Sequence, residues 1–298
     1  KVLKMKCRLC NVEGSSQPIR ASHVFGGEEK HNFWQCAKCD AIYLHPPLTD
    51  SEEKYFYKKE FEKYMSTRVG DHRDWSNAEK HIATNQDQVK RRWDFLKGHI
   101  FKDMDVLEIG CSSGFMLDKF KSSNCNVVGV EPSGEFLEFI KKNGHKAYEA
   151  IEEVQSSFDL ICHFFVFEHI ANPFSFLKKQ VSMLKEGGVI VAEIPSATDP
   201  LTSLYSIDAF ENFYWSIAHH YYYTPNSLRY VLDKMGLRYE LIPEQRYDLS
   251  NHITWMTDGK PGGQDRFKDV FSNELIKKYG QDLKDSWQCD TIFLKIYK

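Results

Sequence analysis

The chain has 298 residues, with 39 Lys and Arg against 42 Asp and Glu, so its formal net charge is −3. Charges of both signs are mixed along the sequence, and no basic stripe of the kind that binds nucleic acid stands out. No stretch approaches the ~18 consecutive apolar residues of a membrane span, and the first residues lack the apolar core of a signal peptide. We therefore expect a cytoplasmic protein of one large domain, or one large and one small, with neither nucleic acid nor a membrane as partner.

Two Cys-x-x-Cys pairs lie near the start of the chain, Cys7 with Cys10 and Cys36 with Cys39. Each pair can place two thiolates on one side of a metal, and two pairs complete a tetrahedral set. Because sulfur fills all four positions, no position is left for water, and the predicted Zn²⁺ is structural. We expect residues 1–47 to form a zinc ribbon that docks onto the main domain or covers its cleft. The alternatives are a reactive dithiol or a nucleic-acid contact.

The charged segment 48–100 is expected to form helices that connect the ribbon to the next domain. Cap-like chemistry at Ser51 opens one helix, and another is predicted over 85–96. The aromatic side chains of this segment are typical of packing, although Tyr64 is a candidate for contact with a cofactor.

From residue 105 onward, short apolar runs alternate with helical segments. Strands are predicted over 106–109, 127–130, 146–148, 160–164 and 189–194, with helices over 115–122, 134–143 and 174–184. This alternation is typical of an α/β fold with a mostly parallel, Rossmann-like sheet covered on both faces. Two further strands, 239–242 and 291–297, are expected to close the sheet, the last of them antiparallel. A domain over 101–298 would then carry an insertion at about 243–286.

The turn after the first of these strands is the most informative feature. It contains Gly110, Ser112 and Gly114, and the next strand ends in Glu131. A tight turn lets the backbone approach a ligand, and an acid at the next strand tip accepts hydrogen bonds from ribose hydroxyls. Open α/β sheets hold an adenosine in this way. A dinucleotide motif would need glycine where Phe115 stands, so NAD fits poorly.

The same turn, with Glu108 before it, reads E-x-G-x-S-x-G and resembles motif I of the class I S-adenosylmethionine (SAM) methyltransferases. Further segments resemble the family in the same order, at 158–161, 168–173, 184–188 and 194–196. The ribbon in front makes the chain similar to methyltransferases of sugar and surface-polysaccharide pathways. Deoxysugar C-methyltransferases among these carry an additional C-terminal domain, for which this chain has no room.

The resemblance implies SAM as cofactor and a set of residues that meet it. The turn would line the methionine and ribose, Glu108 would face the sulfonium or the amino group, and Glu131 would bind the ribose. The candidate cofactor-binding residues are Glu108, Gly110, Ser112, Gly114, Phe115, Glu131, Pro132, Ser133, Ile151 and Phe164.

Methyl transfer to an alcohol requires alignment of the acceptor and, usually, removal of its proton. His169 is the first candidate for the base, because it follows the fourth strand at the edge where ligands collect. Glu168 could orient it, act as the base, or cap a helix, and His220 is the next candidate. Candidate acceptor contacts are His219, Tyr222, Arg246, Asn251 and His252.

The resemblance implies methyl transfer to an oxygen of a small hydrophilic acceptor, such as a sugar nucleotide or a capsule or lipopolysaccharide precursor. A phosphorylated or phosphoramidate group is a further acceptor. Three alternatives stay open: a sugar C-methyltransferase, an O-methyltransferase of an aromatic metabolite, and a non-enzymatic zinc-ribbon interaction or RNA-binding module.

Overall fold

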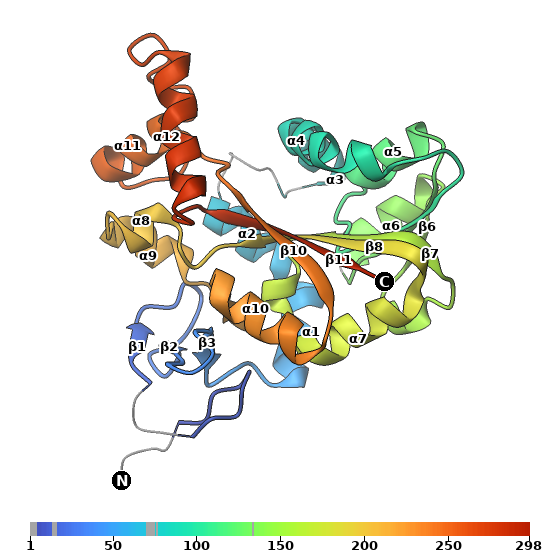
Figure 1. The fold of residues 1–298 in the computed structure, drawn as a ribbon, viewed down its shortest axis with the longest axis horizontal. Helices are drawn as coiled ribbons and strands as arrows, with labels where there is room; N and C mark the ends of the chain where they lie inside the picture. Colours follow the sequence, from blue (N-terminus) through green and yellow to red (C-terminus); the bar gives the residue numbers. More distant parts are fainter. Residues whose placement is uncertain (1–4, 14–16, 70–74, 76, 133) are drawn as a thin grey trace. The chain divides into compact units, whose positions relative to one another are not determined.

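The computed structural model describes residues 5–13, 17–69, 75, 77–132 and 134–298 (Figure 1). The chain divides into two compact units, each assembled from several stretches of sequence. Unit 1 comprises Lys1–Pro47, Phe167–Phe174 and Glu193–Leu294, and unit 2 comprises Leu48–Val166, Ser175–Ala192 and Lys295–Lys298. The domain boundaries expected from the sequence stay a prediction.

A seven-stranded sheet has the order β10-β11-β8-β7-β4-β5-β6. Its strands are β4 (Asp105–Ile109), β5 (Asn126–Val130), β6 (Lys146–Tyr148), β7 (Phe158–Phe164), β8 (Leu184–Pro195), β10 (Arg238–Glu244) and β11 (Thr291–Tyr297). The pairs β4–β5, β4–β7 and β5–β6 are parallel. The last strand, β11, is antiparallel. The predicted Rossmann-like α/β fold is therefore confirmed.

The helices of unit 2 come before and between its strands along the chain. They are α1 (Asp50–Lys59), α2 (Phe61–Val69), α3 (Ala78–Thr84), α4 (Gln86–Leu96), α5 (Phe115–Ser122), α6 (Gly134–Lys142) and most of α7 (Pro173–Met183), with short 3-10 turns η2 (Lys97–His99) and η3 (Ile151–Glu153). Helices α5 and α6 lie on one side of the strands and α7 on the other (Figure 1). Leu117, Leu137 and Ile140 from α5 and α6 form a buried cluster with Ala147 of β6. Apolar residues spaced along each helix thus face the sheet, as the sequence pattern predicts.

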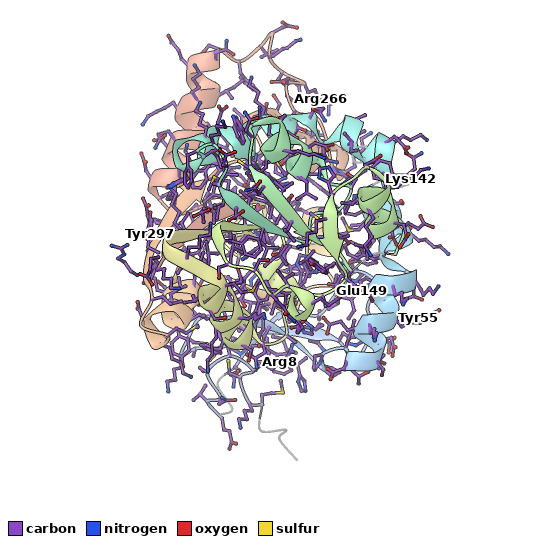
Figure 2. All side chains as sticks on the ribbon, turned by 90° about the vertical axis from the view of Figure 1, so that its right-hand side faces the viewer. Arg8, Tyr55, Lys142, Glu149, Arg266 and Tyr297 are labelled. Carbon is purple, nitrogen blue, oxygen red and sulfur yellow. The ribbon has the colours of Figure 1, made fainter. Side chains whose placement is uncertain are left out.

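Side chains crowd both faces of strands β4 to β7, whereas Tyr55 and Lys142 point away from the body of the protein (Figure 2). Tyr55 is 59% exposed, while its neighbour Phe56 is buried and packs edge-on against Tyr64. The aromatic run of this segment therefore packs mainly on itself.

Several element boundaries differ from the sequence-based expectation, most clearly the starts of α1 and β8. Helix α1 is capped by Thr49 rather than Ser51, because the Thr49 side chain accepts from the Glu52 N–H and the Glu52 side chain accepts from the Thr49 N–H. Strand β8 begins at Leu184, directly after α7, instead of at 189. In this early part of β8 the ammonium of Lys185 bonds carboxylates of β4 and β7 at 2.5 and 2.8 Å.

Unit 1 contains a four-stranded sheet in the order β1-β2-β3-β9. Its strands are β1 (Ile19–Ala21), β2 (Asn32–Gln35), β3 (Ile42–His45) and β9 (Tyr221–Tyr222). All three pairings are antiparallel, and β3 pairs Ile42 with Tyr222. The N-terminal ribbon therefore shares its sheet with a strand that lies far along the chain, inside the aromatic segment.

The other elements of unit 1 surround this sheet or belong to the predicted insertion. They are η4 (Phe167–His169), α8 (Pro200–Ser203), α9 (Asp208–Tyr214), α10 (Pro225–Lys234), α11 (Leu249–Asp258) and α12 (Asn273–Asp285). Phe33, Trp215 and Tyr222 pack ring against ring, with centroids 4.7–5.4 Å apart. None of the described helices combines the length and the apolar character that a membrane crossing demands.

Candidate functional site

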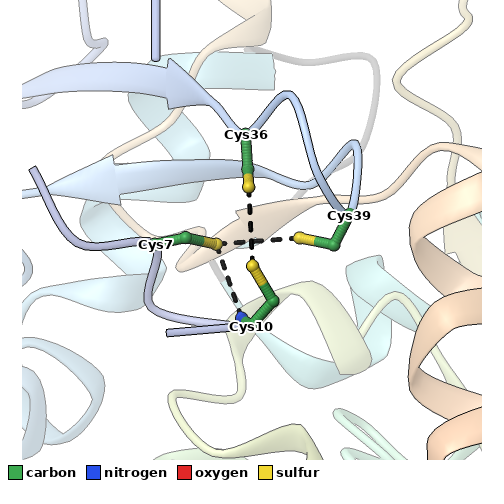
Figure 3. Close-up of side chains that lie close together, drawn as sticks. All are labelled: Cys7, Cys10, Cys36 and Cys39. Atoms are coloured by element: carbon green, nitrogen blue, oxygen red, sulfur yellow. Dashed lines mark hydrogen bonds between the residues drawn. The ribbon is translucent and has the colours of Figure 1, made fainter. Parts of the chain in front are cut away.

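Four cysteines of unit 1 converge in one buried cluster (Figure 3). Cys7 Sγ lies 3.7 Å from Cys39 Sγ, and Cys10 Sγ lies 3.5 Å from Cys36 Sγ. All four sulfurs lie within 4.8 Å of one another, and none forms a disulfide. A tetrahedral zinc with Zn–S bonds of about 2.3 Å separates its sulfurs by about 3.8 Å. The spacing therefore fits the structural zinc that the two Cys-x-x-Cys pairs predict.

The glycine turn of unit 2 is pre-shaped by its backbone. Gly110, Ser112 and Gly114 all have positive φ angles, of 69°, 45° and 84°. A Cβ on Gly110 would lie 2.4 Å from Cγ2 of Val166, so only glycine fits there. Glu131, at the end of β5, accepts a 2.6 Å hydrogen bond from the Ser112 N–H. The turn and the acid at the next strand tip therefore lie together, as predicted.

Glu108 lies under this turn, on β4, and is 2% exposed. Burial raises the pKa of Glu108 to about 8, and the charge of Arg92 opposes this rise. Arg92, on α4, is also buried, and its guanidinium lies 4.4 Å from the ring centroid of Phe164. Unit 2 thus holds a buried carboxyl group and a buried guanidinium next to the predicted cofactor turn.

The remaining predicted cofactor residues follow strand ends of unit 2. Phe115 begins α5, and Phe164 ends β7, with both side chains buried. Ile151 begins η3 and is buried, whereas Pro132 is exposed after β5. Ser133 lies outside the described residues.

Sequence reasoning did not find Arg92, or a cluster of side chains next to the turn. His81 of α3 bonds the Ser113 hydroxyl through Nδ1 at 2.8 Å. The ring centroid of Trp75 lies 4.3 Å from that of His81. The Trp75 ring also stacks on Phe136, with a distance of 5.6 Å between the two centroids. No motif marks Arg92 or His81, because both belong to charged helical segments that look like solvated connectors. A buried Arg within a helix is a signal only once burial is known.

Unit 1 brings three predicted site residues together. Glu168 and His169 lie on η4, and their ligand atoms lie within 4.8 Å of each other and of His219. His169 Nε2 is 3.9 Å from Glu168 Oε1, and the rings of His169 and His219 are 4.6 Å apart. Since the Ala218 carbonyl can only accept, the 2.9 Å bond to His169 Nδ1 places the ring proton on Nδ1. The Nε2 atom of His169 is then the basic nitrogen.

His220 and Tyr222 make different contacts from their neighbour His219. His220 Nδ1 accepts from the Arg8 guanidinium of the ribbon at 3.0 Å. Tyr222 is fully buried, and its hydroxyl bonds the Tyr214 carbonyl and the Ser216 N–H. The bond to Arg8 joins the ribbon to the aromatic segment, whereas the hydroxyl of Tyr222 is bonded within that segment.

The other predicted acceptor contacts lie in a buried polar cluster of unit 1. Arg246 Nε is 3.8 Å from the Glu193 carboxylate. Asn251 donates to the Gly262 carbonyl at 2.7 Å, and His252 Nδ1 bonds the Tyr279 hydroxyl at 2.5 Å. Burial lowers the pKa of His252 to about 4, so this ring is neutral near pH 7.

Known proteins resemble this chain over its central part. Residues 79–242 match the family model described as "Methyltransferase domain", which is more than half of the chain. A ubiquinone biosynthesis O-methyltransferase of Nitrobacter winogradskyi is 32% identical over 29% of this chain and 37% of its own length. A tRNA U34 carboxymethyltransferase of Alteromonas mediterranea is 29% identical over 34% of this chain and 36% of its own length. The chain thus spans little more than a third of these two relatives.

Solved structures show the same fold. The plantazolicin methyltransferase BpumL, in complex with a monoazolic substrate analog and SAH, has a TM-score of 0.50 and 14% identity. The alignment covers 83% of this chain and 95% of that one. The related BamL complex aligns with a TM-score of 0.50 over 83% of this chain and 97% of its own. At this identity the likeness shows the fold alone. The chain belongs to the methyltransferase-domain family and contains a class I SAM-dependent methyltransferase domain.

Proposed function

We propose that the whole protein transfers a methyl group from SAM to an oxygen of a small hydrophilic acceptor. The observation that carries this proposal is the glycine turn of unit 2, bonded through the Ser112 N–H to Glu131. Several relatives are O-methyltransferases of ubiquinone biosynthesis, which supports oxygen as the target atom. The acceptor class, a sugar nucleotide or surface-glycan precursor, rests on the resemblance that the ribbon and the methyltransferase motifs carry together. A phosphorylated or phosphoramidate group belongs to the same proposal.

SAM supplies an electrophilic methyl group on a sulfonium, so the protein has mainly to bind, orient and exclude water. Glu131 would accept hydrogen bonds from the ribose hydroxyls, and Gly110 allows the backbone to approach the ligand. Glu108 would face the positive charge of the cofactor's methionine part. The buried guanidinium of Arg92 is suited to the methionine carboxylate, since Arg binds planar carboxylates through two parallel hydrogen bonds.

Cofactor affinity should rise with pH between about 6.5 and 8. In the free protein Glu108 has a pKa of about 8, so it is mostly protonated at pH 7. A cationic ligand favours the ionised carboxylate, so binding releases a proton, and affinity gains up to about tenfold per pH unit below pH 8. Calorimetric titration in two buffers of different ionisation enthalpy counts this proton. The Glu108→Gln variant should show no such slope, and a flat wild-type profile from pH 6.5 to 8.5 would refute the assignment.

Proton removal from the acceptor is proposed for His169. Its Nδ1–H is held by the Ala218 carbonyl, which leaves Nε2 as the basic atom. Glu168, 1% exposed, would stabilise the protonated ring. His219 and Arg246 are proposed to contact the acceptor, and the same role for Tyr222, Asn251 and His252 stays a prediction. A base role for His220 stays a prediction, and its bond to Arg8 favours a structural role.

A structural zinc in the four-cysteine cluster is also proposed. Cys36→Ser should reduce the zinc content from about one equivalent to none, because three thiolates hold the ion far more weakly. The ribbon should then melt early, whereas affinity for S-adenosylhomocysteine should change less than about threefold. Metal analysis, thermal melts and calorimetry measure these effects. Cys125→Ser, at a free cysteine outside the cluster, is the matched control. Equal loss of zinc and cofactor binding would show that the ribbon is needed for the cofactor domain.

An acceptor screen tests the proposed function. Purified protein and SAM are incubated with sugar nucleotides, with catechols and quinols, and with bulk tRNA, and S-adenosylhomocysteine release is followed. Turnover with sugar nucleotides supports the proposal. The ubiquinone-pathway relatives favour an aromatic acceptor, a catechol or quinol, as the second candidate. The tRNA-modifying relative favours RNA as the acceptor. Turnover confined to either of these would overturn the acceptor class, and a methylated carbon in the product would make the enzyme a C-methyltransferase.

A further inference from the structure

We propose that Glu168, His169 and His219 bind a divalent transition-metal ion, separate from the zinc of the four cysteines. The three side chains come from two segments of unit 1 about fifty residues apart, η4 and the stretch before β9. One ligand atom of each lies within 4.8 Å of the other two. Two imidazoles and one carboxylate form a ligand set that suits a first-row transition metal.

The second ring nitrogen of His169 makes the kind of hydrogen bond that is typical of a metal-ligating histidine. A ligating histidine usually donates its second ring N–H to a backbone carbonyl or a carboxylate, which fixes its tautomer and orientation. His169 Nδ1 makes such a bond to the Ala218 carbonyl at 2.9 Å. Its other nitrogen, Nε2, lies 3.9 Å from Glu168 Oε1. The residue that provides this carbonyl directly precedes His219, so one short segment supplies both a ligand and the support for another ligand.

Charge and distance also favour a cation. Glu168, which would supply the carboxylate ligand, is only 1% exposed. A divalent cation bound there would be held by a carboxylate in surroundings of low dielectric, where opposite charges attract more strongly than in water. Metal–ligand bonds of about 2.1 Å would separate the ligand atoms by about 3.0–3.4 Å. The ligand atoms of the three side chains therefore need to move about 1 Å closer to one another when the ion binds.

Three protein ligands leave at least one coordination position open, as catalytic metal sites require and structural ones do not. The side chain of His169 is 16% exposed, so the cluster is not sealed from solvent. An acceptor hydroxyl bound there would lose its proton to solvent more easily. Its oxygen would then form the new O–C bond while the S–C bond breaks and its electron pair stays on sulfur.

This metal role refines the proposed function, and rests on it, because His169 would then act as a ligand rather than as the base. Binding of the ion does not rest on methyl transfer, so the two claims can fail separately. Mn²⁺ is the probe, because it prefers nitrogen and oxygen ligands to thiolates and should leave the four-cysteine cluster unaffected.

The experiment titrates the full chain, with its zinc in place, with Mn²⁺ alone and follows the free-ion EPR signal. The wild type should bind one equivalent, and Glu168→Gln and His219→Ala should weaken binding at least 100-fold. His220→Ala, at the adjacent residue whose ring bonds Arg8, should keep it. His169→Ala provides a third ligand variant if burial of Glu168 or His219 makes those variants unstable in thermal melts.

No binding by the wild type below millimolar Mn²⁺, or equal binding by folded ligand variants, would overturn the proposal. Once an acceptor is known, chelation should lower turnover at least tenfold, and Mn²⁺ should restore it. Binding of Mn²⁺ without any effect on turnover would remove the catalytic role of the ion and leave His169 as the base. Turnover without Mn²⁺ binding would leave the proposed methyl transfer intact and refute the metal site.

Discussion

The His169→Ala variant should lose roughly 100-fold or more in kcat, while its affinity for S-adenosylhomocysteine should change less than about threefold. The expected loss follows from the usual contribution of a general base, and removal of a metal ligand would cost at least as much. Affinity is spared because the proposed cofactor residues belong to unit 2, whereas His169 belongs to unit 1. Steady-state kinetics with the acceptor found in the screen, together with calorimetry, measure both quantities.

A matched control for this variant is His99→Ala. His99 lies on η2 of unit 2, outside the proposed site, so its removal should leave kcat within about twofold. An unchanged kcat for His169→Ala would remove His169 from the chemistry. Equal losses of kcat and cofactor affinity would instead indicate that η4 supports the cofactor site.

The Gly110→Ala variant should bind S-adenosylhomocysteine roughly 30-fold more weakly, or more. A positive φ of 69° at a non-glycine residue costs about 1–2 kcal/mol, and the new Cβ would also lie 2.4 Å from Val166 Cγ2. The backbone of the turn must shift to relieve this contact, and the Ser112 N–H that bonds Glu131 would shift with it. Calorimetry and thermal melts distinguish a displaced turn from a destabilised domain.

Two further variants separate strain from collision. Gly144→Ala introduces a methyl group at a similar φ of 77° with no atom within 4 Å, so it should lower stability slightly and leave cofactor affinity unchanged. Val166→Ala combined with Gly110→Ala removes the colliding methyl and should recover part of the affinity. If the single Gly110→Ala variant binds like the wild type, then close approach at Gly110 does not shape the cofactor site.

Local patterns predicted most of the fold because they need no knowledge of distant parts of the chain. Helix α5 and strand β6 have the bounds that the sequence predicts, 115–122 and 146–148, and a turn glycine, Gly114 or Gly144, comes shortly before each. Strand β8 was predicted too short, because Gly187 and Gly188 are typical of a turn before a strand, whereas the structure includes both residues in β8. The pairing of β3 with β9 could not be predicted, because a two-residue strand carries no recognisable periodicity.

The candidate site was also predicted only in part, where local sequence determines it. The four cysteines and the glycine turn have fixed spacings, so their convergence follows from local sequence. His81 on α3 and Arg92 on α4 were recognised as candidates only because the structure buries both side chains. His219 and His220 were both candidates, and they lie in the irregular segment directly before β9. The structure turns one ring towards His169 and the other towards Arg8, a choice that the sequence does not reveal.

Calorimetric titration with S-adenosylhomocysteine tests the central claim most directly, with NAD as the control ligand. The claim is that the glycine turn and Glu131 form a SAM site. We expect micromolar binding of S-adenosylhomocysteine, no binding of NAD, and loss of at least tenfold in affinity in Glu131→Ala, which removes the acceptor for the ribose and for the Ser112 N–H. A folded, zinc-loaded protein that binds no S-adenosylhomocysteine, or binds it equally well without Glu131, would contradict the account.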